Sequence, residues 1–151
     1  SSLHPLLLVE DSPDEEALAL RALRRHGVGE AVFVARDGAQ ALDFLLAAGD
    51  HAGRDPAATP ALVLLDLNLP RVDGFEVLRR MRADPRTCLI PVVVFTSSAL
   101  EQDVRMALNL GANSFVRKPL DAAAYDAAIA AVAAYWLGMN LPAPNCGERG
   151  G

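Results

Sequence analysis

Short apolar runs alternate along the chain with longer segments in which apolar residues recur at helical spacing. Each run is bounded by polar or turn residues, as expected for strands buried in a parallel sheet. The predicted strands cover residues 6–9, 31–35, 61–65, 91–95 and 114–117.

The segments between these runs carry the signals of helices. Ser12 begins a capping box with Pro13 at the first helical position, and Gly111 stands where a left-handed helix cap is expected. The predicted helices cover residues 12–27, 38–48, 75–82, 100–110 and 121–137. Five alternations of strand and helix predict an α/β domain, with a parallel sheet and helices on both faces. We expect this domain to span residues 1–138 and a tail to cover 139–151.

Hydrophilic side chains that could share one site follow the first, third, fourth and fifth predicted strands, at the point where each strand ends. They are Glu10 with Asp11, then Asp66, Thr96 and Lys118. Taken alone, Asp66 could simply end a strand and begin a turn, as Asp often does. Right-handed crossovers, however, bring the carboxyl ends of parallel strands to one edge of the sheet. We therefore expect these groups to meet there.

Such a cluster predicts a particular chemistry. Carboxylates gathered at one edge repel one another unless a cation lies between them, and an all-oxygen ligand set suits Mg²⁺. Asp66 is then the best-placed nucleophile toward phosphorus, and its product would be an acyl phosphate. The Lys118 ammonium and the Thr96 hydroxyl can stabilise the oxygens of the transferring group.

Four stretches of the chain resemble those of a known family, in the same order. They are VEDS (9–12), LLDLNLPRVDG (64–74), FTSSA (95–99) and SFVRKP (114–119). In these stretches, and over residues 6–137 as a whole, the chain resembles the receiver domains of two-component response regulators. The resemblance implies a doubly wound, flavodoxin-like sheet with strand order 2-1-3-4-5. It also implies a signalling protein rather than an enzyme, apart from the protein's part in its own phosphorylation and autodephosphorylation.

The resemblance assigns roles to individual residues. Asp66 would accept a phosphoryl group from a phosphohistidine of a sensor kinase. Asp11 and Asp66 would ligate Mg²⁺ together with the backbone carbonyl of Asn68, and Glu10 would hold a metal-bound water.

The same family pattern implies a conformational switch. Lys118 would pair with the phosphoryl group, and Thr96 would move toward it on activation. Phe115 would turn inward as Thr96 moves. Family members often carry Tyr at this position, and Phe lacks the hydroxyl that could form a hydrogen bond in an outward state.

Within the family, the chain is most similar to single-domain regulators that partner phytochrome-type histidine kinases. The features are a long loop over residues 49–60, the sequence DLNLP, and Tyr135-Trp136-Leu137 near the end of the last predicted helix.

Three other functions have to be weighed. A receiver that only binds proteins, without phosphorylation, would not need all the reacting positions filled. A haloacid-dehalogenase-type phosphatase needs a second Asp as general acid, where this chain has Asn68. A flavodoxin-like flavin carrier needs a phosphate-binding loop after the first strand, where acidic residues would repel the phosphate.

Charge, hydropathy and cysteine content bear on where the protein is located and on what it binds. The net charge of −5 argues against a broad nucleic-acid surface. Residues 122–139 are apolar, but they carry Asp126 and barely reach spanning length, so a helix of a soluble protein is favoured. Cys88 and Cys146 match no metal or redox spacing and predict no disulfide framework, as suits the cytoplasm.

The last predicted helix is short of polar residues for its solvent face. Between residues 122 and 137 the only charge is Asp126. A core stripe of Tyr125, Ile129, Val132 and Trp136 leaves Tyr135, Leu137 and Met139 with few polar neighbours. Scattered exposed apolar residues are common, but we expect a homodimer that uses this helix and its tail.

Overall fold

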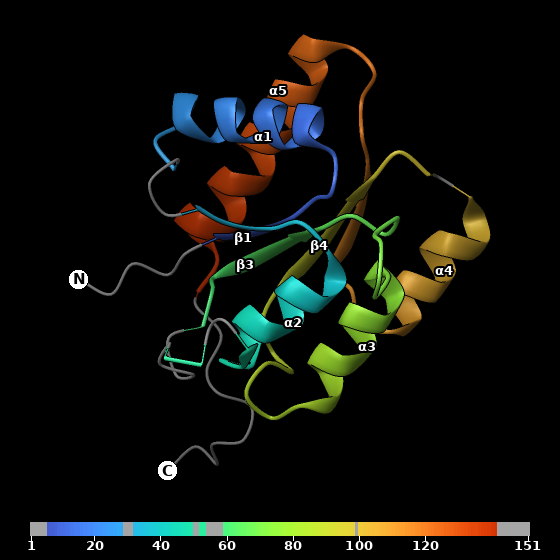
Figure 1. Cartoon of the computed structure of the whole chain (residues 1–151). Helices are drawn as coiled ribbons and strands as arrows, with labels where there is room; N and C mark the ends of the chain where they lie inside the picture. The colour runs from blue at the N-terminus through green and yellow to red at the C-terminus, as the bar shows by residue number, and fades with distance from the viewer. Residues whose placement is uncertain (1–5, 29–31, 50–51, 54–58, 99, 142–151) are drawn as a thin grey trace.

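A five-stranded parallel sheet forms the centre of the computed structural model (Figure 1). The structure describes residues 6–28, 32–49, 52–53, 59–98 and 100–141. The strands are β1 (Leu6–Val9), β2 (Val32–Ala35), β3 (Leu62–Leu65), β4 (Val92–Thr96) and β5 (Ser114–Arg117). Their order is β2-β1-β3-β4-β5 and every pairing is parallel, which confirms the predicted fold class.

The helices follow the strands in alternation. They are α1 (Pro13–Arg25), α2 (Gly38–Leu45), α3 (Gly74–Ala83), α4 (Glu101–Asn109) and α5 (Ala122–Ala133), and η3 (Ala134–Met139) is π-helical. Side chains cap four helix starts: Ser12, Asp37, Asp73 and Asp121 each accept a hydrogen bond from a backbone N–H three residues on. The predicted second helix ends early, at Leu45, because Ala47 takes a left-handed backbone conformation (φ 52°). The loop over 49–60 falls largely outside the described residues.

Two layers of helices cover the sheet, with α1 and α5 on one face and α2 and α3 on the other (Figure 1). Alternate strand residues enter two separate cores: Leu7 and Val9 pack with the α2 and α3 side, whereas Leu6 and Leu8 pack with α1 and α5. Successive strand residues point to opposite faces of the sheet, and both faces are buried. The strands are therefore continuous apolar runs in the sequence.

The register of the sheet positions the residues that follow the strands. Val9 lies beside both Ala35 and Leu65, and Thr96 lies beside Arg117. Glu10, Asp66 and Lys118 directly follow β1, β3 and β5. They therefore lie together at the edge of the sheet where the strands have their carboxyl ends.

The C-terminal helix packs only one side against the rest of the protein. Tyr125, Ile129 and Ala133 are buried in the core shared with α1, and Val132, Trp136 and Leu137 are partly buried against it. Tyr135 and Met139 are 47% and 74% exposed. By length and composition Ala122–Met139 could cross a membrane, with 17% of this window buried. Its buried residues belong to the domain core, as in a helix of a folded domain.

Cys88 is disulfide-bonded, although the two distant cysteines predict no disulfide framework. Cys146 is the only other cysteine of the chain and lies outside the described residues.

Candidate functional site

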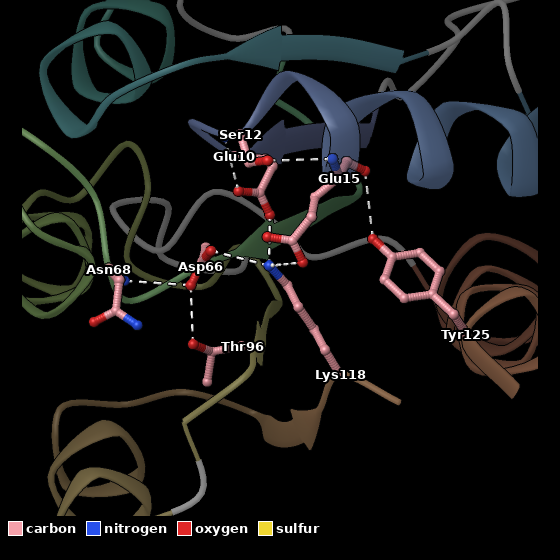
Figure 2. A network of polar contacts seen from close by, with 8 residues as sticks. All are labelled: Glu10, Ser12, Glu15, Asp66, Asn68, Thr96, Lys118 and Tyr125. Carbon is pink, nitrogen blue, oxygen red and sulfur yellow. Dashed lines mark hydrogen bonds and ion pairs between the residues drawn. The ribbon is translucent and has the colours of Figure 1, made fainter. Parts of the chain in front are cut away.

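Asp66 lies at the centre of a buried polar cluster, directly after β3 (Figure 2). Its backbone N–H donates to the Val9 carbonyl at 3.1 Å and so extends the sheet pairing by one residue. Its Oδ1 accepts hydrogen bonds from the Thr96 hydroxyl at 2.9 Å and from the Asn68 backbone N–H at 3.2 Å. Its Oδ2 lies 3.0 Å from the Lys118 ammonium. With 7% exposure, Asp66 has its carboxylate held in one orientation at the edge of the sheet.

Lys118 reaches this cluster from the end of β5. Its backbone N–H donates to the Thr96 carbonyl at 2.8 Å, which fixes the start of the side chain beside β4. Its Nζ lies 2.6 Å from Glu10 Oε1, 2.9 Å from Glu15 Oε1 and 3.0 Å from Asp66 Oδ2. The contacts to Glu10 and Asp66 are hydrogen bonds, and the contact to Glu15 is an ion pair, so three carboxylates surround this ammonium.

Burial changes the proton affinity of these groups. Burial raises the pKa of Glu10 to about 7, although the hydrogen bond and charge of Lys118 act in the opposite direction. Burial also acts to lower the pKa of Lys118, but its hydrogen bonds to Glu10 and Glu15 and the charge of Asp66 outweigh it and raise that pKa. The lysine is therefore a permanent cation at neutral pH, and Glu10 is the group that titrates there.

Gly74 lets the start of α3 approach Asp66 closely. Asp73 caps this helix by accepting a hydrogen bond from the Glu76 backbone N–H at 2.9 Å. A Cβ atom at position 74 would lie 2.5 Å from the backbone oxygen of Asp66 and 2.7 Å from Leu67 Cα. No side chain fits there, so a glycine is required for the loop after β3 to fold back against the helix.

The structure brings together four of the residues that the sequence placed at the strand ends: Glu10, Asp66, Thr96 and Lys118. Asp11 follows Glu10 but is exposed. Among the described residues, the carboxylates within 4.8 Å of one another are Glu10, Glu15 and Asp66, without Asp11. Asn68 is exposed beside the cluster and contacts Asp66 through its backbone. The metal roles of Asp11 and Asn68 stay predictions.

Glu15 is the residue of the cluster that sequence reasoning missed. It lies in the first turn of α1, shortly after the end of β1. In the sequence, a glutamate three residues after Ser12 is already accounted for by the capping box. Its backbone N–H is 3.4 Å from Ser12 Oγ, while its side chain turns toward Lys118. The sequence feature that could have identified Glu15 is its place in the first helical turn after the acidic end of β1. A side chain there points back toward the start of the helix and can lie over the strand end.

The switch residues occupy different surroundings. Thr96 is fully buried, and its hydroxyl already contacts Asp66. Phe115, on β5, is half-buried and packs against the core on the α2 and α3 side. The predicted inward turn of Phe115 is a motion that stays a prediction.

The donor set fits a hard divalent cation. Three carboxylates face one ammonium, so the cluster keeps a net negative charge when all four groups are ionised. Carboxylate oxygens are the ligands that Mg²⁺ prefers, and a cation there would relieve their repulsion.

Comparisons with known proteins agree on one family. The family model described as the response regulator receiver domain matches residues 6–130. The chain is 40% identical over 135 residues to a probable methanogenesis regulatory protein, FilR2, of Methanothrix harundinacea (strain 6Ac), covering 89% of this chain and 84% of that protein. It is 34% identical to the response regulator Rcp1 of Synechocystis sp. (strain ATCC 27184 / PCC 6803 / Kazusa), covering 91% and 92%.

Solved structures have the same fold. The manganese-bound form of Rcp1 superposes with a TM-score of 0.85 at 32% identity, covering 93% of this chain and 99% of that chain. The phosphorylated cyanobacterial phytochrome response regulator RcpA superposes with a TM-score of 0.84 at 33% identity, covering 91% and 96%.

Proposed function

Because this chain belongs to the response regulator receiver domain family, we propose that it is a single-domain response regulator that accepts a phosphoryl group on Asp66. The observation that carries the proposal is the environment of Asp66, whose two carboxylate oxygens contact the Thr96 hydroxyl and the Lys118 ammonium. These are the donors that a phosphoryl group on this carboxylate needs. The receiver domain would span residues 1–138, with a tail over 139–151.

The transfer is a nucleophilic displacement at phosphorus. A carboxylate oxygen of Asp66 attacks the phosphorus of a phosphohistidine on a sensor kinase. The new P–O bond forms as the P–N bond breaks, and the imidazole of the donor leaves with the electron pair. The product on this chain is an acyl phosphate, and hydrolysis by water returns the carboxylate and inorganic phosphate. This hydrolysis is the autodephosphorylation that we propose.

Magnesium would be held by Asp11, Asp66 and the backbone carbonyl of Asn68, with Glu10 binding a metal-coordinated water. When bound, the ion neutralises negative charge on the phosphoryl oxygens. The manganese-bound form of the relative Rcp1 supports the binding of a divalent cation, and the carboxylates grouped at this edge of the sheet offer the oxygen ligands that it needs. Lys118 and Thr96 supply the remaining donors, one charged and one neutral.

The output follows from a change of shape. Phosphorylation adds about −1.5 to −2 charge units to the cluster. It can alter binding to partners only by favouring one conformation over another, and we propose that Thr96 and Phe115 carry this change toward the surface.

The relatives suggest the partners. RcpA is described as a phytochrome response regulator, so we propose a phytochrome-type histidine kinase as the phosphoryl donor. We further propose a cytoplasmic homodimer that forms through α5, η3 and the tail and that binds neither nucleic acid nor membrane. The exposed Tyr135 and Met139 support this dimer surface.

Incubation with acetyl phosphate and Mg²⁺ tests the function. We expect the intact protein mass to rise by one phosphoryl group, and the label to be lost in Asp66→Asn and when EDTA replaces Mg²⁺. Unlabelled wild-type protein would favour a module that binds partners without phosphorylation. Rapid turnover of phosphomonoesters would favour a phosphatase.

A further inference from the structure

We propose that Glu15 is a positioning residue: a displaceable counter-ion that holds the Lys118 ammonium in the resting protein and gives it up to the phosphoryl group. This inference rests on the proposed function and assigns a role to a residue of α1, outside the strand ends.

The three carboxylate partners of Lys118 differ in their freedom to leave. The side chains of Glu10 and Asp66 are 4% and 8% exposed and begin at the ends of β1 and β3. The side chain of Glu15 is 35% exposed and comes from the first turn of α1. Only Glu15 can turn into water without leaving a buried carboxylate unpaired, a change that is costly for the other two.

The contacts of the lysine make Glu15 the partner that a phosphoryl group would displace. Lys118 donates hydrogen bonds to Glu10 and Asp66 and forms an ion pair with Glu15, as Figure 2 shows. A phosphoryl group on Asp66 takes over the contact of Asp66 with this ammonium and brings further oxygen acceptors, so it competes with Glu15 for the lysine. The incoming group also adds negative charge beside Glu15, which favours the carboxylate that can reach solvent moving away.

The backbone of Glu15 is restrained, so the movement is confined to its side chain. The Tyr125 hydroxyl, on α5, donates to the Glu15 carbonyl at 3.4 Å. Tyr125 is itself 5% exposed and packs edge-on against Phe95, with ring centroids 5.2 Å apart. The start of α1 is thus tied to α5 whether or not the Glu15 carboxylate contacts Lys118.

The chain offers a matched control. Glu16 is the next residue of the same helix, and its carboxylate pairs with Arg36 at 3.0 Å instead of Lys118. Glu15→Gln and Glu16→Gln therefore remove the same charge from neighbouring positions, with only the first affecting the lysine. We expect Glu15→Gln to lower the KM for acetyl phosphate by about two- to fivefold, as for loss of one partly exposed charge, with a smaller change in the maximal rate. Glu16→Gln should keep the wild-type KM.

A second readout needs no phosphoryl transfer. Lys118 is the only lysine of the chain, so lysine-selective ¹⁵N labelling gives a single side-chain ammonium signal. We expect Glu15→Gln to shift this signal in the metal-free protein and Glu16→Gln to leave it in place. Adding Mg²⁺ and beryllofluoride, a phosphoryl mimic, should bring the wild-type and Glu15→Gln signals together, because Glu15 no longer contacts the lysine in either.

The outcomes separate the two proposals. If wild-type protein is labelled but Glu15→Gln keeps the wild-type KM and ammonium signal, the role of Glu15 is wrong and the proposed function stands. A tenfold loss of Mg²⁺ affinity with slower labelling in Glu15→Gln would make Glu15 a metal ligand and overturn the counter-ion role. If wild-type protein is not labelled at all, both the function and the displacement fail.

Discussion

The Thr96 hydroxyl donates a hydrogen bond of 2.9 Å to Oδ1 of Asp66. Both residues are buried: Thr96 is the last residue of β4, and Asp66 directly follows the neighbouring strand β3. The neutral donor of the switch thus already contacts the proposed phosphoacceptor. A phosphoryl group on Asp66 would take over this hydrogen bond, so the conformational response can begin with the loss or transfer of one contact.

Replacing Thr96 by Val should separate phosphorylation from its structural consequence. Val keeps the shape but removes the hydroxyl, and the loss of one buried hydrogen bond should lower the free energy of unfolding by about 1 kcal/mol. We expect phosphorylation of the wild-type protein to change the fluorescence of Trp136, the only tryptophan of the chain. In Thr96→Val, acetyl phosphate should still label Asp66, because Lys118 remains, but this change in fluorescence should disappear.

Thr87→Val is the matched control for Thr96→Val. Thr87 is equally buried, and its hydroxyl donates to the Met81 carbonyl at 2.7 Å, away from the site. It should lose similar stability and keep the fluorescence response. A normal response in Thr96→Val would remove Thr96 from the switch.

The raised pKa of Glu10 predicts how stability depends on pH. Its pKa is about 7 in the folded protein, against 4.5 for an unperturbed Glu. Between these values the folded state binds more protons than the unfolded state, so this group's contribution to stability falls as pH rises from 4.5 through 7. The loss over this window is up to about 3 kcal/mol.

Urea unfolding in EDTA, at a series of pH values, measures this dependence. Glu10→Gln should remove most of the fall between pH 4.5 and 7, since Gln does not titrate. A wild-type protein whose stability rises steadily across this range, with the same slope in Glu10→Gln, would contradict the assignment.

Gly74→Ala should damage both the fold and the site. The added Cβ would lie 2.5 Å from the Asp66 carbonyl oxygen, so the loop or the helix must shift. We expect a loss of about 1–3 kcal/mol in unfolding free energy and slower labelling of Asp66. Gly53→Ala meets no atom within 4 Å and should change neither quantity. Equal stability of the two variants would show that the close approach at Gly74 is not needed.

The proposed dimer surface can be tested by adding charge. Tyr135→Glu and Met139→Glu place a carboxylate on the exposed side of η3 and should convert the dimer into a monomer in sedimentation experiments. Leu108→Glu puts the same charge on an equally exposed position of α4 and should leave the dimer intact. A wild-type protein that stays monomeric at micromolar concentration, with and without phosphorylation, would refute the dimer.

The strands and the order of elements could be predicted from local pattern, and the helix ends less well. Apolar runs such as Leu62–Leu65 are buried on both faces, so every residue in them carries the same signal. The end of α2 depends instead on the left-handed backbone at Ala47, a conformation that an alanine in the sequence does not predict. The last helix changes to π-helical geometry after Ala133, which the alanine-rich pattern also did not indicate.

Sequence alone determined that Glu10, Asp66, Thr96 and Lys118 meet, because the carboxyl ends of parallel strands reach one edge of a sheet whatever the side chains are. Tertiary structure decided which carboxylates surround the lysine: Glu15 turns in from α1, and Asp11, next to Glu10, stays exposed. It also decided that Arg82 joins α3 to the Ile90 and Gly111 carbonyls. The physical reason is that the apolar pattern of a strand fixes which residue follows it at the edge of the sheet. The direction of a side chain on a helix, or of a long side chain, depends instead on neighbours that only packing brings close.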